Sequence, residues 1–266
     1  ADGDSLPILT TRKENELILH IADRLPKNPG GKFKARVATE KRRDTTLNHS
    51  ATHLLHEALR SVLGTHVEQK GSLVKDTALR FDFSHFQKVS PEELQEVENR
   101  VNEAIRENRQ LDERRNIPLE EAKNAGAMML FGEKYGDTVR MIGFGSSIEL
   151  CGGTHVQATG EIGLFRITSE GAVAAGIRRI EAETGPLAVA GTVAQRDLLR
   201  RTSEALKSPS DLVSAVEELQ AKVTALQKEV EGHRHAQAME LKQRLMKDIV
   251  RPGGKGTMGV LIQEVP

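Results

Sequence analysis

The sequence predicts an α+β fold, in which an antiparallel sheet and packed helices surround a metal site. Strand-like apolar stretches alternate with segments whose apolar residues recur at helical spacing. Two pairs of metal-binding residue types, His49 with His53 and Cys151 with His155, stand about a hundred residues apart. A metal held by both pairs would tie two distant segments into one domain. We expect strands of a β-barrel before this domain, and a long helical hairpin or coiled coil after it.

Four segments are predicted along the chain. Residues 1–40 contain the strands of a truncated barrel, and residues 41–184 form the metal-binding domain. Residues 185–250 are helical, and residues 251–266 begin a further domain. The sequence starts without Met and stops just after the apolar residues 259–262, so we interpret it as a piece of a longer protein.

Composition argues against several classes of protein. The 38 basic and 38 acidic residues cancel, so any contact with RNA must use a local patch. With no Trp and one Tyr, stacking of bases on an aromatic platform is not expected. A single cysteine excludes an internal disulfide framework and fits a reducing cytoplasm. Neither a signal peptide nor an apolar stretch near 18 residues is present, which argues against export and against a membrane.

The N-terminal segment is predicted to contain two strands. The first is the apolar stretch 17–21, and the second covers residues 33–37. Prolines and glycines at 26–31 form the turn between them. We interpret His20 as an ordinary strand residue rather than a metal ligand.

The first helix is predicted to begin at the capping residues 44–46 and to run to about Leu63, where Gly64 ends it. Apolar residues at helical spacing support this assignment. The basic residues 41–43 just before it are interpreted as a solvated face, with contact to RNA phosphate as the alternative. His56 is expected to be an exposed or capping residue.

A hairpin is predicted next, with strands at 66–74 and 78–83 joined by a turn at 75–76. The returning strand alternates apolar and polar residues, as a half-buried strand does. Three polar residues cluster on the first strand: Gln69, Lys70 and Ser72. From the residues alone, a functional role and an ordinary solvated strand are equal alternatives for them.

Two further helices are predicted, one from Pro91 to about Asn108 and one from Pro118 to Ala125. We expect strands within 128–144, and a strand at 148–150 that places Cys151 at its end.

A strand at 162–167 follows. The small residues 171–177 are predicted to form a loop that leads into Arg178 and Arg179. Such a loop lets a backbone approach closely and could place two guanidinium groups on phosphate, although small-residue loops are commonly just turns.

The C-terminal helical segment carries a heptad pattern. Apolar residues recur over 212–230 in alternating steps of four and three. An antiparallel hairpin folded onto residues 185–207 and an intermolecular coiled coil are both consistent with this short pattern. Residues 251–254 are predicted to end the helix, and residues 257–265 to begin a strand.

The two His- and Cys-containing pairs favour Zn²⁺. His49 and His53 share one helix face at spacing i, i+4, and Cys151 and His155 have the same spacing in a glycine-rich turn. Three imidazoles and one thiolate suit zinc. The first pair is similar to the H-E-x-x-H helix of zinc proteases, but Ser50 stands where the general base would be, which argues against protease chemistry. The alternatives are polar helix positions and a small buried cysteine.

Five motifs in residues 45–184 resemble the editing domain of alanyl-tRNA synthetases, and they occur in the order found in that family. The motifs are N-H-S-A-T-H-L-L-H at 48–56, Q-K-G-S-L-V at 69–74, R-F-D-F at 80–83, C-G-G-T-H at 151–155 and A-G-I-R-R-I-E-A at 175–182. The resemblance implies hydrolysis of Ser-tRNA and Gly-tRNA specific for alanine, in the cytoplasm. The aminoacylation domain and its ATP site are absent from these motifs, so we do not expect amino-acid activation.

The resemblance also implies roles for individual residues. It makes His49, His53, Cys151 and His155 zinc ligands, and it connects Gln69 with catalysis. Weaker implications make Lys70, Ser72, Arg178 and Arg179 contacts to the substrate or its RNA. Whether zinc activates water or only positions the substrate stays open.

Other interpretations are a zinc-stabilised module that binds tRNA and assembles without turnover, and a threonyl-type editing domain. The C-G-G-T-H motif and the helical segment after it favour the alanyl type. The expected partners are the mischarged tRNA, the rest of the synthetase chain and, through the helical segment, a second copy.

Overall fold

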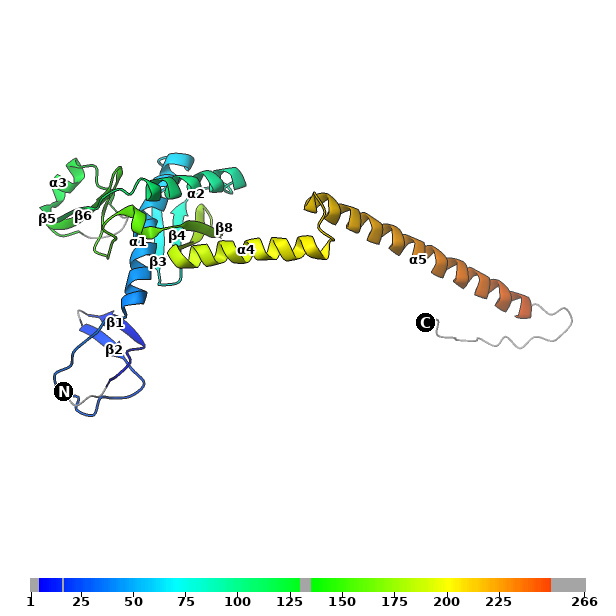
Figure 1. Cartoon of the computed structure of the whole chain (residues 1–266), viewed down its shortest axis with the longest axis horizontal. Coiled ribbons are helices and arrows are strands. Elements are labelled where there is room, and N and C mark those ends of the chain that lie inside the picture. The colour runs from blue at the N-terminus through cyan, green and yellow to red at the C-terminus, as the bar shows by residue number, and fades with distance from the viewer. Residues whose placement is uncertain (1–4, 16, 130–134, 250–266) are drawn as a thin grey trace. The chain divides into compact units, whose positions relative to one another are not determined.

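The structure is a computed structural model that describes residues 5–15, 17–129 and 135–249 (Figure 1). The chain separates into two compact units, residues 1–191 and 192–266. The predicted α+β class is confirmed, because the strands form three antiparallel sheets and helices pack against them. None of the helices within the described ranges is both long and apolar enough to cross a membrane.

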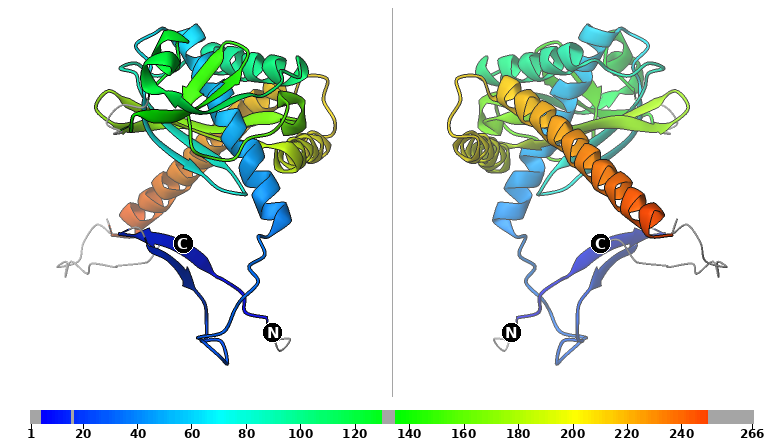
Figure 2. Two further views of the ribbon diagram at one scale, coloured as in Figure 1. Left: turned by 90° about the vertical axis from the view of Figure 1, so that its left-hand side faces the viewer. Right: turned by 90° about the vertical axis from the view of Figure 1, so that its right-hand side faces the viewer.

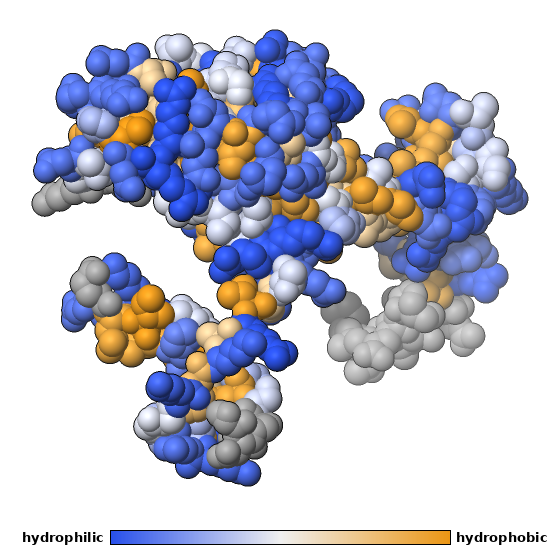
Figure 3. All heavy atoms as spheres, turned by 60° about the vertical axis from the view of Figure 1, so that its left-hand side comes forward, coloured by the Kyte–Doolittle hydropathy of each residue, from blue (hydrophilic) through white to orange (hydrophobic). Residues whose placement is uncertain are grey.

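The N-terminal segment contains one hairpin, formed by β1 (Thr10–Glu14) and β2 (Leu17–Ile21). The predicted strand at 33–37 is wrong, since residues 32–38 form an irregular stretch that leads into the first helix. Phe33 and Val37 are exposed there, so no packing holds them in a strand. Apolar side chains of this segment reach the surface in the space-filling view (Figure 3). The barrel around the hairpin stays a prediction.

Helix α1 (Thr39–Leu63) is the helix that carries the first His pair. It begins at Thr39 rather than at residues 44–46, so the predicted N-cap is wrong. Thr45 and Thr46 instead donate to the carbonyls one turn earlier, at 2.7 and 2.8 Å, as hydroxyls inside a helix do. The basic residues 41–43 are good helix formers and extend the helix backwards. Gly64, with φ of 115°, ends the helix as predicted.

The central sheet has the strand order β3-β4-β9-β8, with β3 (Gln69–Val74), β4 (Leu79–Ser84), β8 (Phe165–Ala174) and β9 (Ile177–Thr184). The predicted hairpin of β3 and β4 is confirmed, with a bulge between Gln69 and Gly71. Helix α1 packs on β3, β4 and β9, and α2 (Pro91–Arg106) packs on α1 and β8 (Figure 2). The core between them includes the following fully buried side chains: Leu54, Leu55, Leu59, Phe81, Phe83, Val97, Val101 and Ile180.

The loop predicted at 171–177 is wrong, because residues 171–174 belong to β8 and the turn is confined to Ala175 and Gly176. Small residues are weak strand formers by themselves. Here they lie opposite long ones, with Ala172 paired to Arg178 and Gly171 paired to Arg179. Cross-strand pairing therefore decides the conformation, and it places both arginines inside a regular strand.

A third sheet consists of β5 (Asp112–Pro118), β6 (Thr138–Phe144) and β7 (Ser147–Leu150). Strand β5 was not expected, because its charged residues show no apolar alternation. The short helix α3 (Leu119–Asn124) completes this part, together with a small second core, whereas η1 (Thr159–Ile162) packs on α1 and α2. That core consists of Ala122, Val139, Met141 and Leu150. Strand β7 ends directly before Cys151, as predicted.

The helical segment consists of α4 (Gly185–Ala205), which begins in the first unit, and α5 (Leu212–Ile249) in the second. Leu212 is half-buried, and the heptad residues of α5 from Val216 to Val230 are exposed, with fractions from 37% at Val216 to 59% at Leu226. The hairpin and the coiled coil both stay predictions. The features predicted at 251–254 and 257–265 lie outside the described residues.

Candidate metal centre

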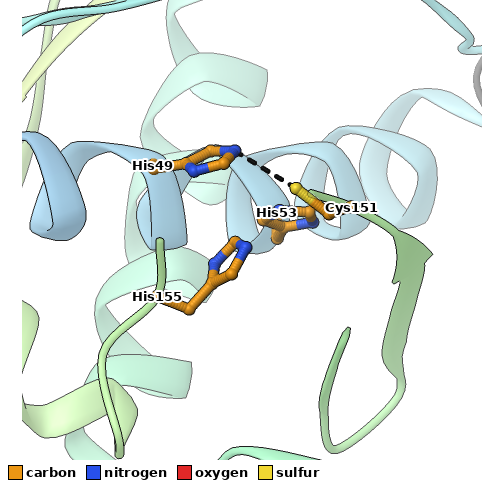
Figure 4. A group of neighbouring side chains, drawn as sticks. All are labelled: His49, His53, Cys151 and His155. Atoms are coloured by element: carbon orange, nitrogen blue, oxygen red, sulfur yellow. Dashed lines mark hydrogen bonds between the residues drawn. The ribbon is translucent and has the colours of Figure 1, made fainter. Parts of the chain in front are cut away.

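Four side chains from two distant parts of the chain point toward one another (Figure 4). His49 and His53 come from α1, Cys151 follows β7, and His155 lies in the loop after it. One possible ligand atom from each side chain can be chosen so that all four lie within 4.8 Å of one another. His49 Nε2 is 3.4 Å from Cys151 Sγ. The predicted convergence of the two motifs is therefore present in the fold.

The α1 half of the cluster is held from behind by a carboxylate. His53 is 5% exposed, and its Nδ1 lies 2.6 Å from Oε2 of Glu149, which is also buried. The contact is short but lies off the straight hydrogen-bond line, so we treat it as an ion-pair contact. Because Nδ1 makes this contact, Nε2 is the ring nitrogen that is available to bind a metal ion.

The loop half of the cluster depends on a close approach of backbone to ring. A Cβ on Gly153 would lie 1.9 Å from Cε1 of His49, whereas one on Gly152 would meet nothing within 4 Å. Arg140 fixes the loop by donating from Nη1 to the carbonyls of Cys151 (3.0 Å) and Gly153 (2.5 Å). Only glycine at position 153 lets the loop carry Cys151 this close to α1.

Ser50 joins the two halves. Its side chain is fully buried, donates to the Thr46 carbonyl at 3.0 Å and accepts from the Val156 amide at 3.1 Å. It also lies 3.5 Å from Nδ1 of His155. Sequence reasoning noted only that Ser50 replaces a catalytic acid, whereas the structure shows it to be a link between α1 and the second motif. His155 Nε2 is buried without a hydrogen-bond partner among the described residues, as expected of a ligand atom.

Charges in the cluster are strongly coupled. Burial opposes ionisation of Cys151, but the neighbouring imidazoles of His155, His49 and His53 outweigh it and lower the pKa of the thiol to about 3. Burial likewise opposes protonation of His53, yet the attraction of Glu149 raises its pKa to about 10. The thiolate is the metal-binding form of cysteine. A thiolate and a nearby carboxylate call for positive charge, which a protonated His53 supplies in the metal-free site and a divalent cation would supply when bound.

The geometry fits zinc. A tetrahedral site with bonds of about 2.0–2.3 Å has ligand-to-ligand distances of about 3.3–3.8 Å. The ligand atoms, all within 4.8 Å of one another, are thus separated by at most about 1.0–1.5 Å more than that arrangement requires. Three nitrogens and one sulfur are also the donor set that zinc prefers.

The other predicted site residues lie on the central sheet. Half-buried Gln69 sits at the β3 bulge opposite Phe83. Lys70 contacts Glu68 at 2.8 Å, and Ser72 is exposed. The roles of these three residues stay predictions.

Both predicted RNA-binding arginines form ion pairs within the domain. Arg179 donates two hydrogen bonds of 2.6 and 2.8 Å to Asp82, and Arg178 forms an ion pair with the buried side chain of Glu170. Their contact with RNA stays a prediction.

Two residues beside the cluster were missed. His56 is 2% exposed rather than surface-located, and its Nδ1 makes a 2.8 Å hydrogen bond with Oε1 of Glu149. Its ring lies 5.2 Å from that of Phe81. Glu149 was noted only as part of the strand before Cys151. An acid inside an otherwise apolar strand was the signal that could have singled it out.

Comparison with known proteins agrees with this geometry. Residues 139–181, which contain the second motif, match the family described as the threonyl and alanyl tRNA synthetase second additional domain. The chain also matches alanine–tRNA ligases over nearly its whole length. The alanine–tRNA ligase of Christiangramia forsetii is 51% identical over 249 residues, which is 94% of this chain and 29% of the relative.

The chain corresponds to a segment of the alanyl-tRNA synthetase family. Two more alanine–tRNA ligases support this, from Flavobacterium psychrophilum with 53% identity over 94% of the chain and from Porphyromonas gingivalis with 45% over 99%. The chain covers 28% and 30% of their lengths, so it spans less than a third of an alanyl-tRNA synthetase.

Proposed function

We propose that this chain carries the zinc-dependent editing site of an alanyl-tRNA synthetase and hydrolyses the ester of Ser-tRNA and Gly-tRNA specific for alanine. The observation that supports this best is the convergence of His49, His53, Cys151 and His155 within 4.8 Å. The family match at residues 139–181, which includes half of these side chains, is consistent with it.

Physical chemistry explains why such a site is needed. A pocket sized for the methyl group of alanine cannot exclude the smaller glycine, and it rejects the extra hydroxyl of serine only weakly. Binding differences of that kind supply about 1–3 kcal/mol of discrimination. A second site that hydrolyses the wrong ester supplies the rest.

The proposed reaction assigns different roles to the metal-binding residues, to Gln69 and to Ser50. His49, His53, Cys151 and His155 would hold the ion, and when bound it would supply Lewis acidity at an ester carbonyl or at a water. Gln69 offers an amide that can orient the reacting group by hydrogen bonding. Ser50 does not serve as the general base, because a neutral hydroxyl is a very weak base and its oxygen already accepts a hydrogen bond from the Val156 amide.

Contacts to the RNA are proposed on the sheet. Ser72 and Lys70 are exposed on β3, which supports their proposed contact to the substrate. For Arg178 and Arg179, a phosphate has to share the guanidinium with the carboxylates of Glu170 and Asp82. The proposed partners are the rest of the synthetase chain and a second copy that binds through α5. The proposed compartment is the cytoplasm.

Deacylation of Ser-tRNA specific for alanine tests the proposal. We expect Cys151→Ala to lower the rate by more than about tenfold with loss of zinc, because a metal ligand is removed. Gln69→Ala should lower hydrolysis while zinc stays bound. Unchanged hydrolysis in a metal-free Cys151→Ala variant would refute a catalytic metal.

Two alternatives give different results in the same experiment. A chain that binds the tRNA but does not hydrolyse its ester is an assembly module. A chain that deacylates serine from the threonine tRNA, but not from the alanine tRNA, is of the threonyl type. The matched relatives named above are all alanine–tRNA ligases, which favours the alanyl type.

A further inference from the structure

We infer that Glu149 is a positioning residue of the metal centre, and that its carboxylate, oriented by His56, makes His53 coordinate through Nε2. This inference rests on the metal site of the proposed function and extends it to two residues that are not ligands. Glu149 would act through His53, without touching the ion or the ester.

Side chains alternate between the two faces of β7, and Glu149 lies on the face that is turned toward the metal-binding cluster. Ser147 donates to the His53 carbonyl at 3.3 Å, Glu149 contacts His53 itself, and Cys151 reaches the cluster directly. Ile148 and Leu150 point the other way and pack in the second core. Every second residue from Ser147 to Cys151 therefore serves the metal centre, as the period of a strand dictates.

Each oxygen of the Glu149 carboxylate contacts one imidazole ring. Its Oε2 lies 2.6 Å from Nδ1 of His53, and its Oε1 lies 2.8 Å from Nδ1 of His56. All three residues are at most 5% exposed. A buried carboxylate is unfavourable unless it is paired, and an apolar residue would fill this place at lower cost. Two specific contacts at this depth indicate a role beyond packing.

The chemical consequence concerns which nitrogen of His53 faces the ion. A neutral imidazole has one N–H donor and one acceptor nitrogen. Because Nδ1 of His53 lies 2.6 Å from Glu149, Nε2 is the nitrogen left to face the ion, and metal binding displaces the proton that Nε2 carries. A carboxylate behind a metal-bound histidine fixes the ring and makes it a stronger ligand. His56 holds the second carboxylate oxygen and so keeps Glu149 from rotating away.

Zinc affinity of the whole chain tests the inference without any tRNA. We expect Glu149→Gln to weaken zinc binding by about 10–100-fold in competition with a chromophoric chelator. The visible absorption of bound Co²⁺ should change as well, because the ring of His53 is held differently. Glu149→Asp keeps the charge but reaches only one imidazole, so its loss of affinity should be smaller than that of Glu149→Gln.

Glu170→Gln is the matched control. It also removes a buried carboxylate from an ion pair, with Arg178, but it lies on β8 away from the cluster. We expect it to lower stability while zinc affinity stays within about threefold of the wild type. If Glu149→Gln does not fold, His56→Asn serves instead, with an expected loss of affinity of about three- to tenfold.

Wild-type zinc affinity and Co²⁺ absorption in Glu149→Gln, or in His56→Asn where Glu149→Gln does not fold, would overturn the inference while leaving the editing proposal intact. A wild-type chain that binds no zinc would overturn both.

Discussion

Gly153→Ala is the sharpest test of the metal centre, because the added methyl group would clash with the ring of His49. The added Cβ would lie 1.9 Å from Cε1 and 2.3 Å from Nδ1 of His49. A carbon–carbon contact needs about 3.5–4.0 Å. The ring and the loop must therefore separate by about 1.6–2.1 Å, whereas metal–ligand distances tolerate only about 0.2 Å.

The expected result is loss of His49 as a ligand. Zinc affinity should fall by at least about 100-fold, the upper end of what a weakened supporting contact costs. The backbone φ of Gly153 is not in the left-handed region. Alanine would therefore disturb the packing against His49 without straining the backbone. Deacylation of Ser-tRNA should fall together with zinc content.

Gly152→Ala is the matched control, since its Cβ would meet nothing within 4 Å. It should bind zinc like the wild type in the same chelator competition. Equal zinc affinity and equal Co²⁺ absorption in both variants would show that the loop moves freely, and would refute the reasoning from close approach.

Three further predictions concern the fold and the metal. Leu55→Ala, at a fully buried position, should lower the free energy of unfolding by about 2–5 kcal/mol in urea titrations, and a loss below 1 kcal/mol would contradict the assigned core. The hydrogen bond from Arg179 holds the pKa of Asp82 below its ordinary value, so the carboxylate stabilises the fold at pH 7 and this contribution is lost as pH falls through the lowered pKa. Asp82→Asn should accordingly be less stable than the wild type at pH 7, by a difference that shrinks as pH falls through the lowered pKa of Asp82, and a difference independent of pH would argue against the pair. Zinc at about 1,000 times its Kd should add about 4 kcal/mol of stability, which a chelator removes, seen as a fall in Tm of about 8–16 °C.

The sequence was most informative where local chemistry decides the structure. Spacing alone put His49 and His53 on one helix face, and the glycines beside Cys151 indicated a turn. Pro91 and its acidic first turn predicted α2, whose start has a full capping box at Ser90. In these cases the signal and the stabilising contact lie within a few residues of each other.

It was least informative where partners come from far along the chain. Strand β5 is charged and forms because β6 pairs with it. The small residues of β8 become a strand because Arg178 and Arg179 lie opposite them. The pairing of Glu149 with His56 spans 93 residues, so no local pattern could reveal it. Long-range pairing decides each of these features.

The bulge in β3 has a consequence for how the protein stays monodisperse. Strand β3 is an outer strand of its sheet, and a straight outer strand invites foreign chains to add to it. The irregularity between Gln69 and Gly71, with charged Lys70 inside it, breaks the flat row of backbone groups that such growth requires. The bulge beside Gln69 would thus also protect the edge of the sheet against aggregation, so a variant with a straight β3 should be less soluble.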